Sequence, residues 1–152
     1  MYDIKLSDII QIFESEIKCI NKCLKENHQT ELKKTNNFKL DNIGDFTVLS
    51  CSLKEFKIAN LNIEELILYV YKKYPVKIII DLKNNSINNV YESIKNQFKQ
   101  HILNQSNTNK PRLLQFDYFY EFEINESNNN TIIEIYDNRN YYNLPKYISK
   151  GN

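Results

Sequence analysis

Glycine is scarce in this chain, with two residues among 152. Loops that cradle phosphate with their backbone amides depend on several glycines, because only glycine lets the backbone come that close to the ligand. The sequence therefore predicts no nucleotide-binding loop, and the Gly-x-Ser-x-Gly turn of serine hydrolases is also missing. Tryptophan is absent, and proline occurs three times.

Long apolar runs and paired cysteines are missing as well. No hydrophobic stretch approaches the 18 residues of a membrane span, and the start MYDIKLSDII lacks the basic-then-apolar order of a signal peptide. Cys19, Cys23 and Cys51 are odd in number and contain no Cys-x-x-Cys spacing. We therefore expect free thiols, a cytoplasmic location, and no metal or other cofactor.

The remaining composition is that of an ordinary globular protein, with 41% hydrophobic and 26% charged residues. At this length we expect a single domain covering residues 1–152. Asparagine, lysine and isoleucine are abundant while alanine occurs once, which indicates an AT-rich gene. Such genes are common in the mobile toxin–immunity cassettes of bacteria.

Apolar residues at three- and four-residue steps predict three helices. The first runs from about Ser7 to Glu26, with Glu16 inside its apolar face, either at a groove or paired. The second covers 62–74, where Asn62 and Glu65 resemble a capping box and Pro75 ends the helix. The third begins after Ser86 and runs to about Ile102.

Four strands are predicted from apolar and alternating segments, at 46–53, 76–82, 113–124 and 131–136. The run VKIIIDL at 76–82 is typical of a central strand covered on both faces. The segment 113–124 alternates strictly and predicts one long strand that pairs with 131–136 as an antiparallel hairpin. The predicted fold class is therefore α+β, in the order α-β-α-β-α-β-β, with a mixed sheet and with residues 138–152 as an irregular tail.

The hairpin carries an unusual charge. Between Leu113 and Asp137 there are six acidic residues and no Lys or Arg, so the net charge of +1 divides into −6 here and +7 elsewhere. With Ile124 opposite Thr131, Glu121 would lie opposite Glu134, although like charges in that position destabilise a strand pair. This pattern favours either a solvated acidic face or a docking face for a basic partner. The partner-binding residues expected on it are Asp117, Phe119, Glu121, Glu123, Glu134 and Tyr136.

The function predicted from these features is protein binding without catalysis. The most concrete version is an immunity or antitoxin protein that neutralises a basic toxin, for example a nuclease, through the acidic and aromatic-flanked hairpin. Direct binding of nucleic acid is not expected, because base-stacking aromatic residues normally lie in basic grooves. A homo-oligomer formed through the free edge of the return strand is a further alternative.

Enzymatic alternatives rest on short patterns. Asp81-Leu82-Lys83 resembles the D/E-x-K half of the PD-(D/E)xK nucleases, which implies a Mg²⁺ site with Asp81, and Lys83 near the reacting water. Asp45 and Glu16 are the other acids that could join it. His28 and His101 could form an acid–base pair, and a histidine with the cysteines could bind zinc.

Overall fold

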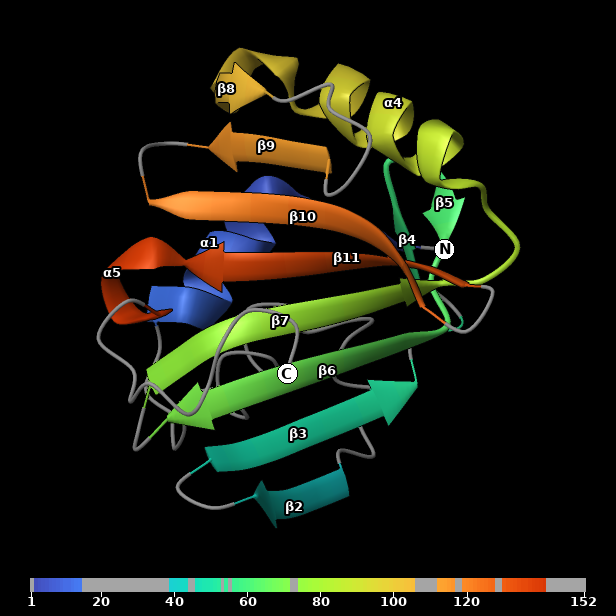
Figure 1. Ribbon diagram of the computed structural model, residues 1–152. Coiled ribbons are helices and arrows are strands. Elements are labelled where there is room, and N and C mark those ends of the chain that lie inside the picture. Colours follow the sequence, from blue (N-terminus) through green and yellow to red (C-terminus); the bar gives the residue numbers. More distant parts are fainter. Residues whose placement is uncertain are drawn as a thin grey trace.

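A computed structural model describes residues 2–14, 39–43, 46–52, 54, 56–71, 74–105, 112–116, 119–127 and 130–141. Its main feature is a large antiparallel sheet of eight strands (Figure 1). In spatial order the strands are β2 (Lys39–Ile43), β3 (Phe46–Ser52), β6 (Glu65–Tyr71), β7 (Tyr74–Leu82), β11 (Asn130–Asp137), β10 (Tyr120–Ser127), β9 (Arg112–Phe116) and β8 (Ile102–Gln105).

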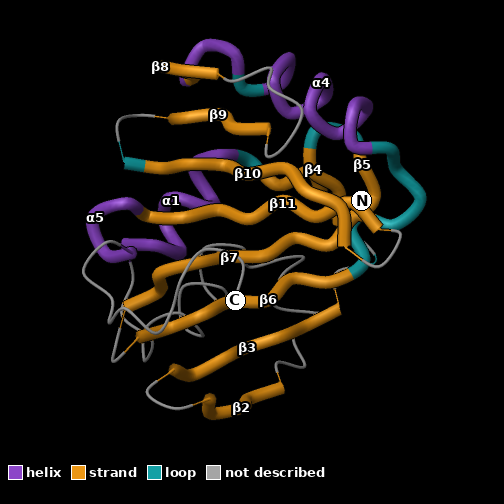
Figure 2. The backbone as a smooth tube through the Cα atoms, in the orientation of Figure 1, coloured by secondary structure: helices purple, strands orange, loops and turns teal. Residues whose placement is uncertain are grey.

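A smaller sheet and the helices lie against this large sheet (Figure 2). The small sheet joins β1 (Tyr2–Ile4), β4 (Phe56–Ile58) and β5 (Leu61–Asn62). Ala59 and Asn60 connect β4 to β5 with positive φ angles of 50° and 64°, as a tight two-residue hairpin turn requires. The helices are α1 (Leu6–Glu14), α4 (Ile87–Gln97), the short 3₁₀ turn η1 (Lys99–His101) and the single turn α5 (Asn138–Tyr141).

The predicted α+β fold with three helices is wrong, because the described chain is mostly β-strand. The second predicted helix, at 62–74, is occupied by β5 and β6. The segment satisfies both periods: Leu66, Leu68 and Val70 alternate, while Ile63, Leu66, Ile67 and Val70 recur at helical spacing. Strand pairing on both sides, with β3 and β7, decides the outcome in favour of the strand.

The predicted long strand 113–124 is also wrong, because it folds back on itself as the hairpin β9–β10. Phe116 pairs with Tyr120, so three residues separate the two strands. An odd link preserves the even-position alternation across the turn, which is why the sequence pattern did not show the break. The β10–β11 pairing is also shifted by two residues, so that Ile124 lies opposite Ile133 and Glu123, not Glu121, lies opposite Glu134.

Other predicted elements are present. Strands 46–53 and 76–82 correspond to β3 and β7, and β7 is a central strand of the sheet. The Ser86 hydroxyl accepts a hydrogen bond from the Asn89 amide and caps α4, which ends at Gln97, before the predicted limit of Ile102. The first predicted helix is seen as α1, with residues 15–26 outside the described part. In the predicted tail, 138–141 form α5 and 142–152 lie outside it too.

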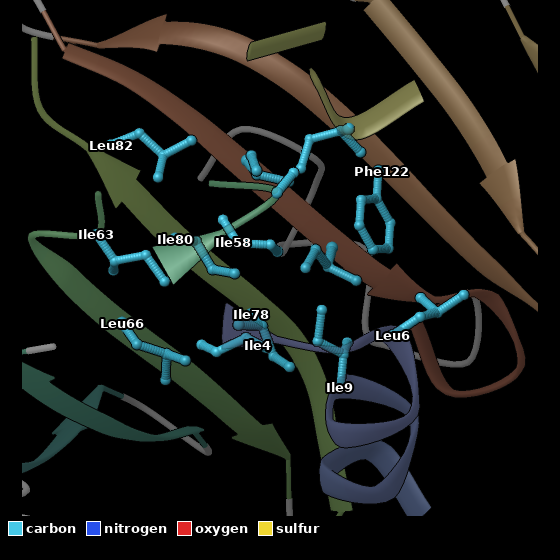
Figure 3. Close-up of a cluster of buried hydrophobic side chains, with 14 of the residues drawn as sticks. Ile4, Leu6, Ile9, Ile58, Ile63, Leu66, Ile78, Ile80, Leu82 and Phe122 are labelled. Atoms are coloured by element: carbon cyan, nitrogen blue, oxygen red, sulfur yellow. The ribbon is translucent and has the colours of Figure 1, made fainter. Parts of the chain in front are cut away.

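One face of the large sheet forms the hydrophobic core. Alternate residues of the central strands, among them Ile78, Ile80 and Phe122, are fully buried there against α1, α4 and the small sheet (Figure 3). Figure 1 shows α1 behind the strands in that view, so the opposite face of the sheet points toward the viewer. We call this opposite face the outer face. Among the described residues, no helix is long and apolar enough to cross a membrane.

Candidate functional site

Side chains on the outer face lie in rows across the strands, because residues paired across neighbouring strands point to the same face of the sheet. Three rows cross strands β6, β7, β11 and β10 in that order. They are Glu65–Asp81–Ile132–Asn125, then Ile67–Ile79–Glu134–Glu123, then Tyr69–Lys77–Tyr136–Glu121. Within these four strands the outer face thus carries five carboxylates and a single cation, Lys77.

One end of this face is a buried ionic cluster, which we define as Tyr69, Lys77, Glu123, Glu134 and Tyr136. Lys77 is 4% exposed, and Glu123 and Glu134 are each 8% exposed. The Lys77 ammonium lies 4.8 Å from the Tyr69 ring centre and 5.8 Å from that of Tyr136. The Tyr136 hydroxyl donates a 2.5 Å hydrogen bond to Glu134 Oε2.

Burial and charge act in opposite directions on the lysine of this cluster. Burial lowers the pKa of Lys77, while the nearby charges of Glu134 and Glu123 raise it, and burial is the larger effect. The pKa of the Tyr69 hydroxyl is raised, first by burial and then by the charge of Glu134. The lysine ammonium therefore stabilises two opposed carboxylates that water no longer screens.

The six residues predicted to bind a partner are not gathered on one accessible surface. Glu123 and Glu134 are buried, and Tyr136 is fully buried. Glu121 is half-buried at the edge of the same rows, and Asp117 lies outside the described residues. Their role in binding stays a prediction, but three of them lie where a partner would not reach them directly.

Phe119, the sixth residue, is 44% exposed in the turn between β9 and β10. The Arg139 guanidinium lies 4.4 Å from its ring centre and bonds Asp137 through Nε and Nη2, at 3.1 and 3.0 Å. The Arg139 Nη2 also donates to the Tyr120 hydroxyl at 3.1 Å. The hairpin acid Asp137, which is fully buried, is therefore already paired with a cation of this chain.

The other end of the outer face is more open. We call Glu65, Ile67, Ile79, Asp81 and Ile132 the isoleucine–carboxylate patch, and each of these residues is half-buried. Glu65 and Asp81 are direct partners across β6 and β7, and so are Ile67 and Ile79. In Figure 1 this patch corresponds to the end of β6, β7 and β11 that lies near the start of β6 and the arrowhead of β7.

Within this patch, the charged carboxylate of Asp81 is unfavourable for the stability of the fold. Burial raises the pKa of its carboxyl, a hydrogen bond from Asn130 lowers it, and the charge of Glu64 raises it further, with a net upward shift. Its Oδ1 atom is buried and has no hydrogen-bond partner in the part of the chain that the structure describes. An ionised group kept at such a cost is typical of functional surfaces.

Replacing Asp81 by asparagine should therefore stabilise the protein at pH 7. Because the folded pKa lies above the unfolded value, ionisation of Asp81 costs stability as the pH rises from about 4. We expect Asp81→Asn to raise the free energy of unfolding by about 0.5 kcal/mol at pH 7, because asparagine removes the cost of burying a charge and the repulsion from Glu64. The gain should shrink as the pH falls to 3.5, because the raised pKa of Asp81 leaves its carboxyl mostly protonated there.

Urea unfolding at pH 7 and pH 3.5 measures this difference. Glu126→Gln, which neutralises an exposed carboxylate on β10, is the matched control and should show no comparable gain. An Asp81→Asn protein that is less stable than the parent at pH 7 would contradict the account of this site.

The residues of the nuclease alternative do not come together in the described part of the chain. Lys83 is exposed in the turn after β7, while Asp45 and Glu16 lie outside the described residues. Phe46, which follows Asp45, pairs with Tyr71, at the end of the sheet opposite the Glu65–Asp81 pair. No group of acidic, histidine or cysteine side chains suited to a metal ion occurs among the described residues.

The histidine and cysteine hypotheses gain no support from position. His101 is exposed at the end of η1, and His28, Cys19 and Cys23 lie outside the described residues. Cys51 belongs to β3, but its side chain is not described. The return strand β11 is paired on both sides, with β10 and β7, so it has no free edge for the oligomer considered above.

Sequence reasoning missed the patch and the role of Lys77. The signal was the lysine inside the apolar run at 76–82, since a central strand covered on both faces rarely carries a charge without a partner. Comparison with known proteins adds no further assignment, because no family model, no curated protein and no solved structure matches this chain.

Proposed function

We propose that this protein is a protein-binding module of the immunity or antitoxin type, which neutralises a basic toxin in the cytoplasm. The observation that carries the proposal is the charge of the outer face, where β6, β7, β11 and β10 bring five carboxylates and one buried lysine together. Three of these carboxylates, Glu65, Asp81 and Glu121, are half-buried and can be approached by a partner. These strands come from distant parts of the sequence, so the acidity extends beyond the hairpin that first indicated it.

Electrostatic complementarity is the physical basis of the proposal. A face with excess negative charge attracts a basic surface over several ångströms and speeds association, while long-range attraction falls as salt shortens the screening length. A basic toxin, for example a nuclease with a cationic substrate groove, has the complementary charge. Blocking that groove with carboxylates would prevent the toxin from binding its negatively charged substrate.

The test begins with the full chain as bait in a lysate of its source cells, at about 0.05 M and 0.5 M salt. The proposal expects one stoichiometric basic protein, retained at low salt and reduced at high salt. That protein, produced separately, should bind with an association rate at least about tenfold lower at the higher salt. Its toxic activity should be lost when it is mixed with one equivalent of this chain.

The Glu121→Lys variant provides a check on the hairpin itself. Glu121 is half-buried and is the most accessible of the acids predicted to contact the partner on the β10 side of the face. Reversing its charge should slow association. A captured protein that is acidic, or whose association does not depend on salt, would contradict the proposed function.

A further inference from the structure

The isoleucine–carboxylate patch differs from the buried ionic cluster in combining apolar and acidic groups at half-buried positions. Ile67 and Ile79 pair across β6 and β7, and Ile132 continues the apolar area onto β11. Half-buried isoleucines grouped on three adjacent strands offer an apolar contact area, which is uncommon on a surface facing only water.

The acids next to these isoleucines give the patch a defined charge. Glu65 and Asp81 lie directly opposite each other, and Glu64 adds its charge near Asp81. Of these three, Glu64 has a described cationic partner, Lys54, at 3.5 Å. A second copy of this chain would bring the same negative charge to the patch, so charge complementarity favours a different molecule with a basic surface.

We propose that the isoleucine–carboxylate patch is the docking site of the basic toxin, with a toxin Lys or Arg between Asp81 and Glu65 and an apolar toxin side chain on Ile79. This inference rests on the proposed function and makes it specific. It moves the centre of the interface from the hairpin across the sheet to β6 and β7.

The energetics of the free protein support this position. Among the described residues, none hydrogen-bonds the buried Oδ1 atom of Asp81, and the charge of Glu64 lies near its carboxylate. A toxin ammonium or guanidinium beside this half-buried carboxylate supplies a counter-charge, so complex formation lowers a cost that the free fold carries. The buried ionic cluster borders the patch, since Ile79 pairs with Glu134 across β7 and β11.

The experiment measures the affinity of the captured basic protein for three single variants of the full chain. Asp81→Lys should weaken binding by about 100-fold, and Ile79→Ser by about tenfold, with the second loss persisting at high salt. Glu92→Lys makes the same charge change at an exposed position of α4 and should alter affinity less than about threefold. Asp81→Asn, which should fold at least as well as the parent, provides the test if Asp81→Lys does not fold.

The outcomes separate the two proposals. If Asp81→Lys, Asp81→Asn and Ile79→Ser bind as tightly as the parent while Glu121→Lys does not, the docking site is overturned and the proposed function stands. If Asp81→Lys and Glu92→Lys weaken binding equally, the loss of affinity reflects the net charge of the protein, and the proposed docking site is again overturned. If no basic protein is captured, the proposed function fails, and the docking site fails with it.

Discussion

The Lys77→Met variant is expected to lose about 3–5 kcal/mol of unfolding free energy at pH 7. Methionine fills a similar volume, so the loss would come mainly from charge. Without the ammonium, Glu123 and Glu134 face each other across β10 and β11 as two buried carboxylates with no cation nearby on these strands. Removing one partner of a buried ionic group leaves the others uncompensated, which costs far more than an exposed ion pair contributes.

A matched variant separates charge from packing in this cluster. Combining Lys77→Met with Glu123→Gln and Glu134→Gln removes all three charges and should recover most of the lost stability. Chemical unfolding of the parent, the single variant and the triple variant provides the comparison. A single variant that loses under about 1 kcal/mol, or a triple variant as unstable as the single one, would show that Lys77 does not stabilise these carboxylates.

Leu68→Ala should destabilise the protein by about 3 kcal/mol, and Ile67→Ala by about 1 kcal/mol or less. Leu68 is 1% exposed on the core face of β6, whereas the preceding residue, Ile67, is half-buried on the outer face. Truncating a fully buried leucine removes its transfer free energy and leaves a cavity, while a half-exposed position loses less of both.

This pair of variants distinguishes the observed strand from the helix that the sequence predicted at 62–74. In that helix the buried stripe would be Ile63, Leu66, Ile67, Val70 and Tyr74, without Leu68, so the order of the two losses would be reversed. Thermal unfolding of both variants gives the order directly. The strand assignment would be contradicted if Ile67→Ala were the more destabilising change. Ile67→Ala should instead weaken binding of the basic partner.

The local sequence pattern was sufficient to predict a helix or a strand where only one hydrophobic period fits the residues. The alternation in 131–136, the apolar run at 76–82 and the Ser86 cap each have one consistent interpretation, and the corresponding elements are present. At 62–74 two periods fit equally well, and only strand pairing with β3 and β7 decides between them. In 113–124 the hairpin turn was hidden because its odd length conserves the alternation.

The site was harder to predict because its parts are distant in sequence. The acidity of the hairpin was visible, but Glu123 and Glu134 are buried near Lys77, which lies on a strand more than 40 residues earlier. Asp81 was noticed for its spacing to Lys83, as a nuclease pattern, and not for its position opposite Glu65. Charge counted along the chain gives the sign of a surface, whereas the sheet register gives its location.

The most direct test of the docking site uses the alternation of isoleucines along the sheet. In a protein labelled at isoleucine methyl groups, NMR titration with the captured basic protein would follow Ile67, Ile79 and Ile132 on the outer face and Ile78, Ile80, Ile133 and Ile135 in the core. The account predicts that the three outer methyl signals shift or broaden first and most. Perturbation of signals elsewhere, with those three unchanged at saturation, would contradict it.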